Sequence, residues 1–255
     1  METTYKLNVP VSTAAVKKAG KLSIDLVPSK VTKWLLAVTA VLLLANILVI
    51  VLKLTMEHQT RLSWYFDQYF NFNYEGNFPT FFSSLILALA AGILLFLYFI
   101  TKQQKNSQAP FRWLILSLIF TFLAIDENIQ IHELITKIVR PRLTTELSGF
   151  LHWAWVVPYS IAFVFIVGYF TPFVLKLPAK TRNMIMLAGF MYVFGAVGLE
   201  LVEGHLYMSY GVEHIFNQLL YCVEELLEMT AVILFIHTLL GYIVSIRVNL
   251  RLRSR

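Results

Sequence analysis

Eight carboxylates stand inside long apolar stretches of this 255-residue chain, and these acids are the residues most able to do chemistry. They are Asp126, Glu127, Glu133, Glu200, Glu203, Glu224, Glu225 and Glu228. All 21 basic residues, in contrast, fall in loops or at the ends of the apolar stretches. An ionised side chain at the bilayer centre costs roughly 3 kcal/mol on insertion scales, so intramembrane acids need a partner and mark functional sites. The sequence therefore predicts that cations or protons balance these acids.

Helical spacing predicts that the acids gather on three stripes. At about 100° per residue, residues three or four apart share one face of a helix. The first stripe holds Asp126, Gln130 and Glu133; the second holds Tyr192, Ala196, Glu200, Glu203 and Tyr207; the third holds Asn217, Tyr221, Glu224, Glu228 and Ala231. Polar stripes at membrane depth must face one another or a wet cavity. Counted at 1.5 Å per residue, all three contain acids roughly 10 to 17 Å below the outer surface. We expect the stripes to meet in the outer half of the membrane.

Carboxylates that converge in a low dielectric can bind cations, hold protons, or form a structural hydrogen-bonded network. Glutamates three or four residues apart are the spacing by which helix bundles build two-metal carboxylate sites. Oxygen ligands favour Ca²⁺, Mg²⁺ or Mn²⁺, and Fe stays open as a further identity. We predict a divalent metal site made by Asp126, Glu133, Glu200, Glu203, Glu224 and Glu228.

Histidines add two conditional ligands to this prediction. His132 and His237 point away from the acidic faces of regular helices, and His237 is expected to be a core histidine. His132 and His152 stand near the outer ends of their stretches, so a bend in a helix could bring either one to the metal.

The elements that must position these residues are transmembrane helices. Hydrophobic residues make up 58% of the chain and charged residues 14%, with a mean hydropathy of +0.67. This composition excludes a soluble domain, and the lack of period-2 alternation excludes an outer-membrane barrel. Six runs have the length of about 20 residues that a spanning helix needs: Trp34–Val51, Thr80–Ile100, Phe111–Ile135, Leu151–Leu175, Asn183–His205 and Ile215–Ile246. We predict an all-α, polytopic transmembrane bundle.

Basic residues predict the direction of the spans. Sixteen of the 21 fall on the side that carries both termini, and five fall on the other. The positive-inside rule therefore predicts that both termini are cytoplasmic. The expected organisation is a polar basic N-terminal segment (1–33), a six-span domain (34–246) with an aromatic outer loop (53–79), and a basic tail (247–255). The aromatic loop is expected to lie in the interface plane. The net charge of +6 reports this topology, and no nucleic-acid partner is expected.

Three motifs carry a resemblance: Asp126-Glu127 followed by His132-Glu133, Gly195-x-x-Gly-x-Glu200, and Glu224-Glu-x-x-Glu-Met229. With these motifs the chain resembles an uncharacterised family of bacterial multi-pass membrane proteins from about residue 77 onward. The resemblance implies a location in the bacterial cytoplasmic (inner) membrane and carries no activity across.

Three functions fit these observations. The first is a cation-handling protein whose acidic cavity binds divalent ions or protons. The second is a metal-dependent membrane enzyme acting on a lipid-like substrate, with Glu127 or Glu225 as general base. The third is an accessory subunit whose polar stripes dock another membrane protein, and a homo-oligomer is equally open. Apart from the lipid bilayer itself, the sequence does not select a partner.

Overall fold

Nearly all of the described chain folds into apolar α-helices. The computed structural model describes residues 27–56, 58–103, 110–142, 149–211 and 214–253. The helices are α1 (Pro28–Thr55), α2 (Arg61–Phe70), α3 (Phe78–Lys102), α4 (Pro110–Ile129), α5 (Ile131–Val139), α6 (Val156–Val174), α7 (Ala179–Val193), α8 (Glu200–Tyr210) and α9 (Ile215–Arg253). Short 3-10 turns cover Arg140–Arg142 and Gly149–Leu151, and a π-helical segment, Phe194–Leu199, joins α7 to α8. These residues form no strand, which confirms the predicted all-α fold.

Five segments are long and apolar enough to cross a membrane, and a sixth is a bent pair of helices. They are Pro28–Thr55, Phe78–Lys102, Val156–Val174, Ala179–Tyr210 and Ile215–Ile246, together with α4 and α5 as the bent pair. The chain is therefore a multi-pass membrane protein.

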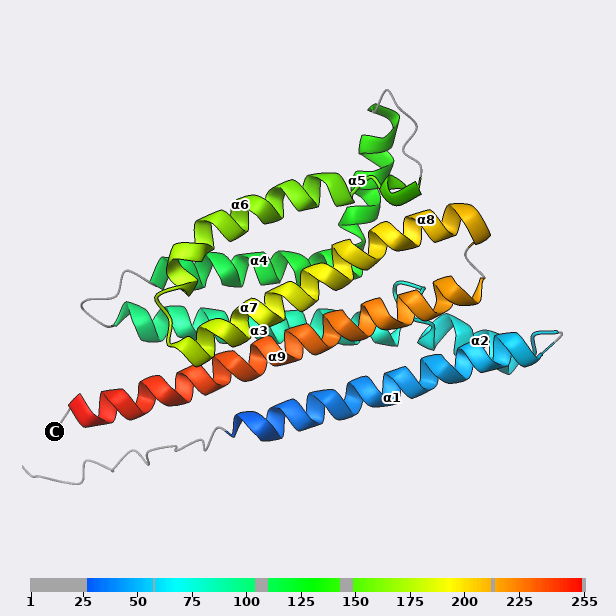
Figure 1. Cartoon of the computed structure of the whole chain (residues 1–255). Coiled ribbons are helices and arrows are strands. Elements are labelled where there is room, and N and C mark those ends of the chain that lie inside the picture. The colour runs from blue at the N-terminus through cyan, green and yellow to red at the C-terminus, as the bar shows by residue number, and fades with distance from the viewer. Residues whose placement is uncertain (1–26, 57, 104–109, 143–148, 212–213, 254–255) are drawn as a thin grey trace, which may run out of the picture.

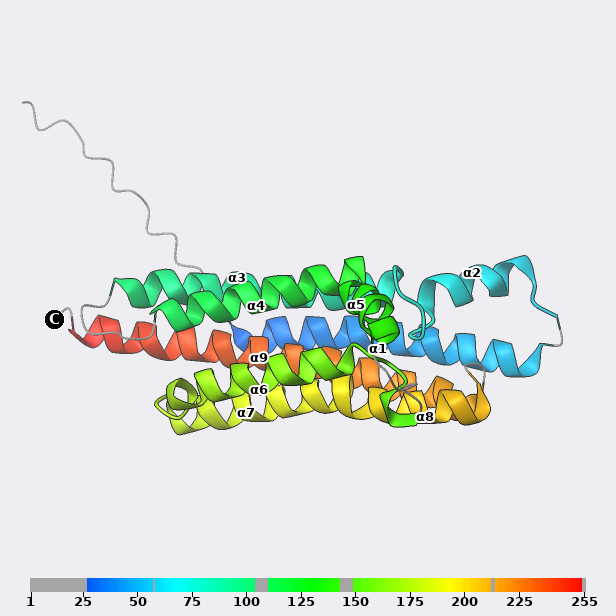
Figure 2. The ribbon, with the colours of Figure 1, turned by 90° about the horizontal axis from the view of Figure 1, so that it is seen from above.

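Helix α9 lies at the centre of the bundle. It packs against α1, α3 and α7, while α3 pairs closely with α4. Figure 2 shows α9 between the α3 and α4 pair on one side and the α6 and α7 pair on the other. Fully buried apolar side chains on three of these helices, among them Leu94, Trp113 and Ile236, make the shared core. Figure 1 shows the start of α1 and the end of α9 at the same end of the bundle.

The predicted third span, Phe111–Ile135, is not one straight helix. The chain breaks at Gln130, whose φ of 61° and ψ of 46° place it in the left-handed region, and α4 and α5 meet at 77°. The Asp126 carboxylate accepts the backbone N–H of His132 at 2.9 Å, and this bond satisfies a donor that the break would leave free. The expected single stripe of Asp126, Gln130 and Glu133 is therefore wrong, because the helix axis turns between its members.

Two further boundaries differ from expectation. The fourth span begins at Val156 instead of Leu151, because Gly149–Leu151 forms a 3-10 turn ahead of it. The aromatic outer loop was expected to lie in the interface plane. Its helix α2 instead folds back along α1, as Figures 1 and 2 show. At 1.5 Å per residue the 28-residue α1 is about 42 Å long, so its end extends past a hydrocarbon core of about 30 Å. Helix α2 packs against α1.

Some predicted regions lie outside the described residues. They include the basic N-terminal segment up to residue 26, part of the loop between α3 and α4 (104–109), and the last two residues of the basic tail.

Candidate metal centre

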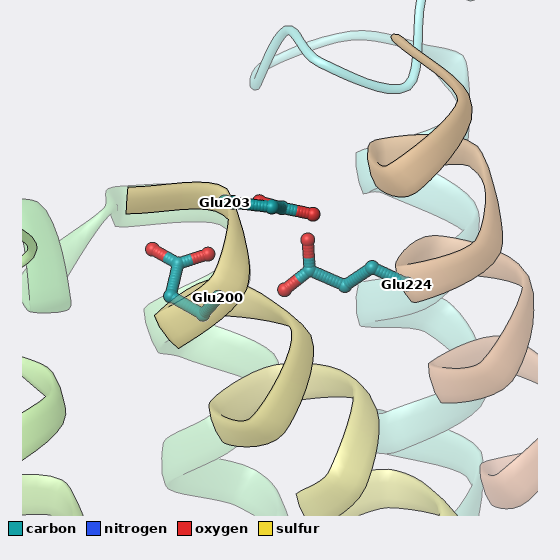
Figure 3. A group of neighbouring side chains, drawn as sticks. All are labelled: Glu200, Glu203 and Glu224. Atoms are coloured by element: carbon teal, nitrogen blue, oxygen red, sulfur yellow. The ribbon is translucent and has the colours of Figure 1, made fainter. Parts of the chain in front are cut away.

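Three glutamates from two helices converge where α8 packs against α9. Glu200 and Glu203 stand one turn apart at the start of α8, and Glu224 comes from α9. One carboxylate oxygen of each lies within 4.8 Å of the corresponding oxygen of the other two. Figure 3 shows the Glu224 carboxylate facing Glu203, with Glu200 on the same helix as Glu203. We call Glu200, Glu203 and Glu224 the three-carboxylate cluster.

Glu203 is the most deeply buried member of the cluster. Its residue is 1% exposed, and neither of its carboxylate oxygens has a hydrogen-bond partner among the described residues. A buried carboxylate without a partner is costly, because its desolvation is not compensated. A cation held between the three carboxylates, or a proton shared among them, would supply the missing partner.

The π-helical segment before α8 aims this cluster at α9. Such segments insert extra backbone into a helical turn, often at functional sites, and so rotate the residues that follow them. Gly195 inside the segment lies against α9: a β-carbon there would meet the Cγ of Glu228 at 3.1 Å and the backbone oxygen of Glu224 at 3.4 Å. The glycine therefore allows the close approach that brings the acidic faces of α8 and α9 together.

Trp155 holds Glu200 in place from outside these two helices. Its indole N–H donates to Oε1 of Glu200 at 3.1 Å, and its ring contacts those of His132 and Tyr159. A hydrogen bond of this kind orients a carboxylate without occupying its second oxygen. Sequence reasoning missed Trp155, because it lies in the irregular segment before α6, where helical periodicity gives no signal.

Asp126 sits in a separate network of protein donors. The Tyr159 hydroxyl donates to its Oδ2 at 2.9 Å, while the backbone N–H of His132 donates to Oδ1. Nδ1 of His132 is 3.3 Å from the same Oδ1, and Nε2 is 3.0 Å from a carboxylate oxygen of Glu75. His132 was expected to face away from the acids, and the break at Gln130 turns it toward Asp126 instead. Tyr159 and Glu75 were also missed.

Glu133 is not a member of the three-carboxylate cluster, although it lines the same cavity. It lies on α5, where its carboxylate is 3.7 Å from the Lys137 ammonium and its side chain is 41% exposed. Its membership of the metal site, like that of Asp126, is not supported by this placement.

A second acidic group lies beside the cluster: Glu127 on α4 with Glu225 and Glu228 on α9. All three line the same cavity as the three-carboxylate cluster. The charges of Glu225 and Glu228 interact unfavourably with each other and with Glu127. The two groups together bring acids of α4, α8 and α9 to one cavity, although the α4 acid among them, Glu127, is not a member of the predicted first stripe.

His152 lies against α8 near the cluster. Its Nδ1 is buried without a hydrogen-bond partner among the described residues, and its ring packs on Tyr207 at a centroid distance of 4.9 Å. Burial, followed by the positive charge of Arg140, lowers the pKa of His152 below its usual value. The ring is therefore neutral at pH 7, which is the state that can ligate a metal.

Both acidic groups open into one large cavity of about 1560 Å³ between α4, α6, α7 and α9. Apolar side chains form most of its walls away from the acids, including Ile119, Phe163 and Val193. Oxygen-only ligation at its acidic end suits Ca²⁺, Mg²⁺ or Mn²⁺.

One family model, described as "Domain of unknown function (DUF8692)", matches residues 35–243. No curated protein and no solved structure matches the chain. The match begins inside α1, so it extends well before residue 77, where the resemblance seen in the motifs begins. Because the model covers most of the chain, including both acidic groups, the protein belongs to this DUF8692 family of unknown function.

Proposed function

We propose that this protein binds a divalent cation at Glu200, Glu203 and Glu224, in the outer half of a bacterial inner membrane. The observation that carries the proposal is Glu203, a carboxylate 1% exposed. Its two oxygens lack hydrogen-bond partners among the described residues, while Glu200 and Glu224 each place an oxygen within 4.8 Å of one of them. Three carboxylates supply more negative charge than one divalent ion neutralises, which favours tight retention of the ion.

Elemental analysis of protein purified in mild detergent tests the proposal. The wild type is expected to carry about one equivalent of metal per chain, and Glu203→Gln is expected to lose it. Glu133→Gln is the matched control, because the same chemical change is made on an exposed acid outside the cluster. Wild-type protein without metal, after growth in medium supplied with Ca²⁺, Mg²⁺, Mn²⁺ and Fe, would contradict cation binding and favour protonated carboxylates.

A metal-dependent enzyme acting on a lipid-like substrate is the second candidate. It is favoured by the cavity, which joins the three-carboxylate cluster to apolar walls deep in the membrane. Glu127 or Glu225 would act as general base, since both line this cavity outside the cluster. Glu225→Gln would then keep the metal and lose turnover of lipid extracts, whereas a cation-handling protein would show no turnover in either form.

The same variants address an accessory role in a larger membrane complex. A docking surface made by the acidic stripes would lose its partner in Glu133→Gln, whose side chain is 41% exposed, and would keep it in Glu203→Gln, because Glu203 is 1% exposed and out of a partner's reach. Co-purification of the wild type and the two variants from their native membrane separates this outcome from loss of an ion.

A further inference from the structure

The cavity between α4, α6, α7 and α9 is far larger than an ion requires. Its volume of about 1560 Å³ exceeds the 300 to 1,000 Å³ common for small-molecule sites. The apolar part runs along α4 from Ile115 to Leu123, opposite residues such as Phe163, Ile166 and Val167 of α6. At 1.5 Å per residue, the distance along α4 from Ile115 to Glu127 is about 18 Å. The space is therefore long, walled by hydrocarbon and acidic at one end.

Charge at the acidic end selects among polar head groups. The described residues that line the cavity include nine acids and no Lys or Arg. His132 is already engaged with Asp126 and Glu75, and the Trp155 indole N–H with Glu200. A phosphate or sulfate head would meet repulsion from Glu127, Glu225 and Glu228 with no basic side chain to offset it. A cationic head would relieve that repulsion.

We propose that the cavity binds a single-chain amphiphile with a cationic amine or quaternary ammonium head, its hydrocarbon chain lying between α4 and α6 and its head among Glu127, Glu225 and Glu228. The inference rests in part on the proposed function, because it assigns the ligand class of the cavity that contains the metal site. Glu203 shows that the acidic end of the cavity lacks positive charge, since this carboxylate lines the cavity, is 1% exposed and has no hydrogen-bond partner among the described residues.

An inorganic cation alone does not account for the whole cavity. The ion occupies the three-carboxylate cluster and leaves both the second acidic group and the apolar walls without a ligand. A hydrocarbon chain is the ligand that apolar walls at membrane depth favour, because a polar ligand there would lose its hydrogen bonds to water without replacing them. The two parts of the cavity together match the two parts of a cationic amphiphile.

Two glycines provide a matched pair of variants. Gly189 on α7 lines the cavity, and a β-carbon added there meets no atom within 4 Å. Gly189→Leu therefore fills the apolar part without a clash at the β-carbon and raises helix propensity. Gly168 on α6 has the same open surroundings but is not among the cavity-lining residues. Gly168→Leu makes the same chemical change outside the cavity.

The experiment measures binding of three dodecyl compounds to protein in lipid nanodiscs by native mass spectrometry. Dodecylamine is expected to bind with about one equivalent, while dodecyl sulfate and dodecanol at the same concentration are not retained. Gly189→Leu, and separately Glu225→Gln, are expected to weaken dodecylamine binding at least tenfold, and Gly168→Leu leaves it unchanged.

Equal retention of the three compounds would overturn the proposal, because binding would then ignore the head group. Unchanged binding in both Gly189→Leu and Glu225→Gln would overturn it as well, because the ligand would lie elsewhere. Metal content is measured on the same samples. Wild-type protein that carries metal but does not bind dodecylamine would contradict only the amphiphile proposal. Wild-type protein that binds dodecylamine without metal would contradict only the proposed cation site.

Discussion

Glu203 is where burial and chemistry conflict most sharply. Glu200, its neighbour on α8, accepts the Trp155 N–H, whereas no described group donates a hydrogen bond to either oxygen of Glu203. A bound cation would convert this unfavourable burial into a stabilising interaction. The same cation would then contribute directly to the free energy of unfolding.

Removal of the metal should therefore destabilise the wild type. A ligand present at 100 times its Kd stabilises the folded state by about 2.7 kcal/mol, which corresponds to a fall in Tm of about 5 to 10 °C on chelation. Glu203→Gln should show no change in Tm with chelator, because it has no ion to lose. Thermal unfolding in detergent with and without chelator measures both, and an equal fall in the two proteins would contradict a site at Glu203.

Trp155 should set the affinity of the site without being a ligand. Trp155→Phe removes the N–H that holds Glu200 and keeps most of the ring, so the affinity for metal should fall about tenfold, as for other groups that orient metal ligands. Trp153→Phe is the control, because the Trp153 N–H is buried but bonds to no described group. Competition with a chelating dye gives both affinities, and equal affinities would show that Trp155 does not orient the site.

At this scale the sequence predicted acids that repeat along one helix and missed residues that reach those acids from other segments, including Tyr159 in α6. Glu200, Glu203 and Glu224 follow from helical spacing, and the structure brings an oxygen of each together. Trp155, Tyr159 and Glu75 contact the acids across large separations in sequence, which no periodicity records.

Two glycines allow close approach between elements at this site, and Gly204 is the tighter of the two. Gly204 on α8 faces the turn at Gly149–Leu151, and a β-carbon on it would lie 2.9 Å from the Cβ of His152 and 3.0 Å from the backbone oxygen of Gly149. Neither atom is the end of a flexible side chain. The close approach of α8 to this turn therefore depends on a single hydrogen atom in place of a methyl group.

Gly204→Ala should force α8 away from the turn and lower stability by about 1 to 3 kcal/mol, the usual cost of overpacking. Gly92→Ala in α3 is the control, because its β-carbon meets nothing within 4 Å and should instead stabilise the helix by about 1 kcal/mol. Opposite signs of the change in Tm are expected. A neutral Gly204→Ala would mean that α8 and the turn are not in close contact.

The break between α4 and α5 shows why element boundaries were harder to predict than elements. Apolar residues continue past Ile129, so hydropathy alone extends the third span to Ile135. The turn depends on Gln130 adopting a left-handed conformation and on Asp126 accepting the N–H of His132. Gln is not a residue that this conformation favours, so its sequence signal is weak.

For the whole molecule, the composition and the lengths of the apolar runs were sufficient to predict an all-α membrane bundle. Those properties are averages over about 20 residues and tolerate errors at single positions. The cavity is different, because its shape depends on which helices stay apart, and helical periodicity gives no information on that. Orientation in the membrane stays a prediction, resting on sixteen basic residues on one side against five on the other.

Single cysteines in a Cys222→Ala background test that orientation. Figure 1 shows the start of α1 and the end of α9 at one end of the bundle, as six crossings require. Residue 58 follows the opposite end of α1 in the sequence. An impermeant maleimide added to spheroplasts should label His58→Cys, an exposed position that the predicted orientation places outside, and should label Lys180→Cys only after lysis, because the same orientation places the first turn of α7 on the cytoplasmic side. The reverse pattern would place the three-carboxylate cluster in the inner half of the membrane, where its ion would exchange with the cytoplasm.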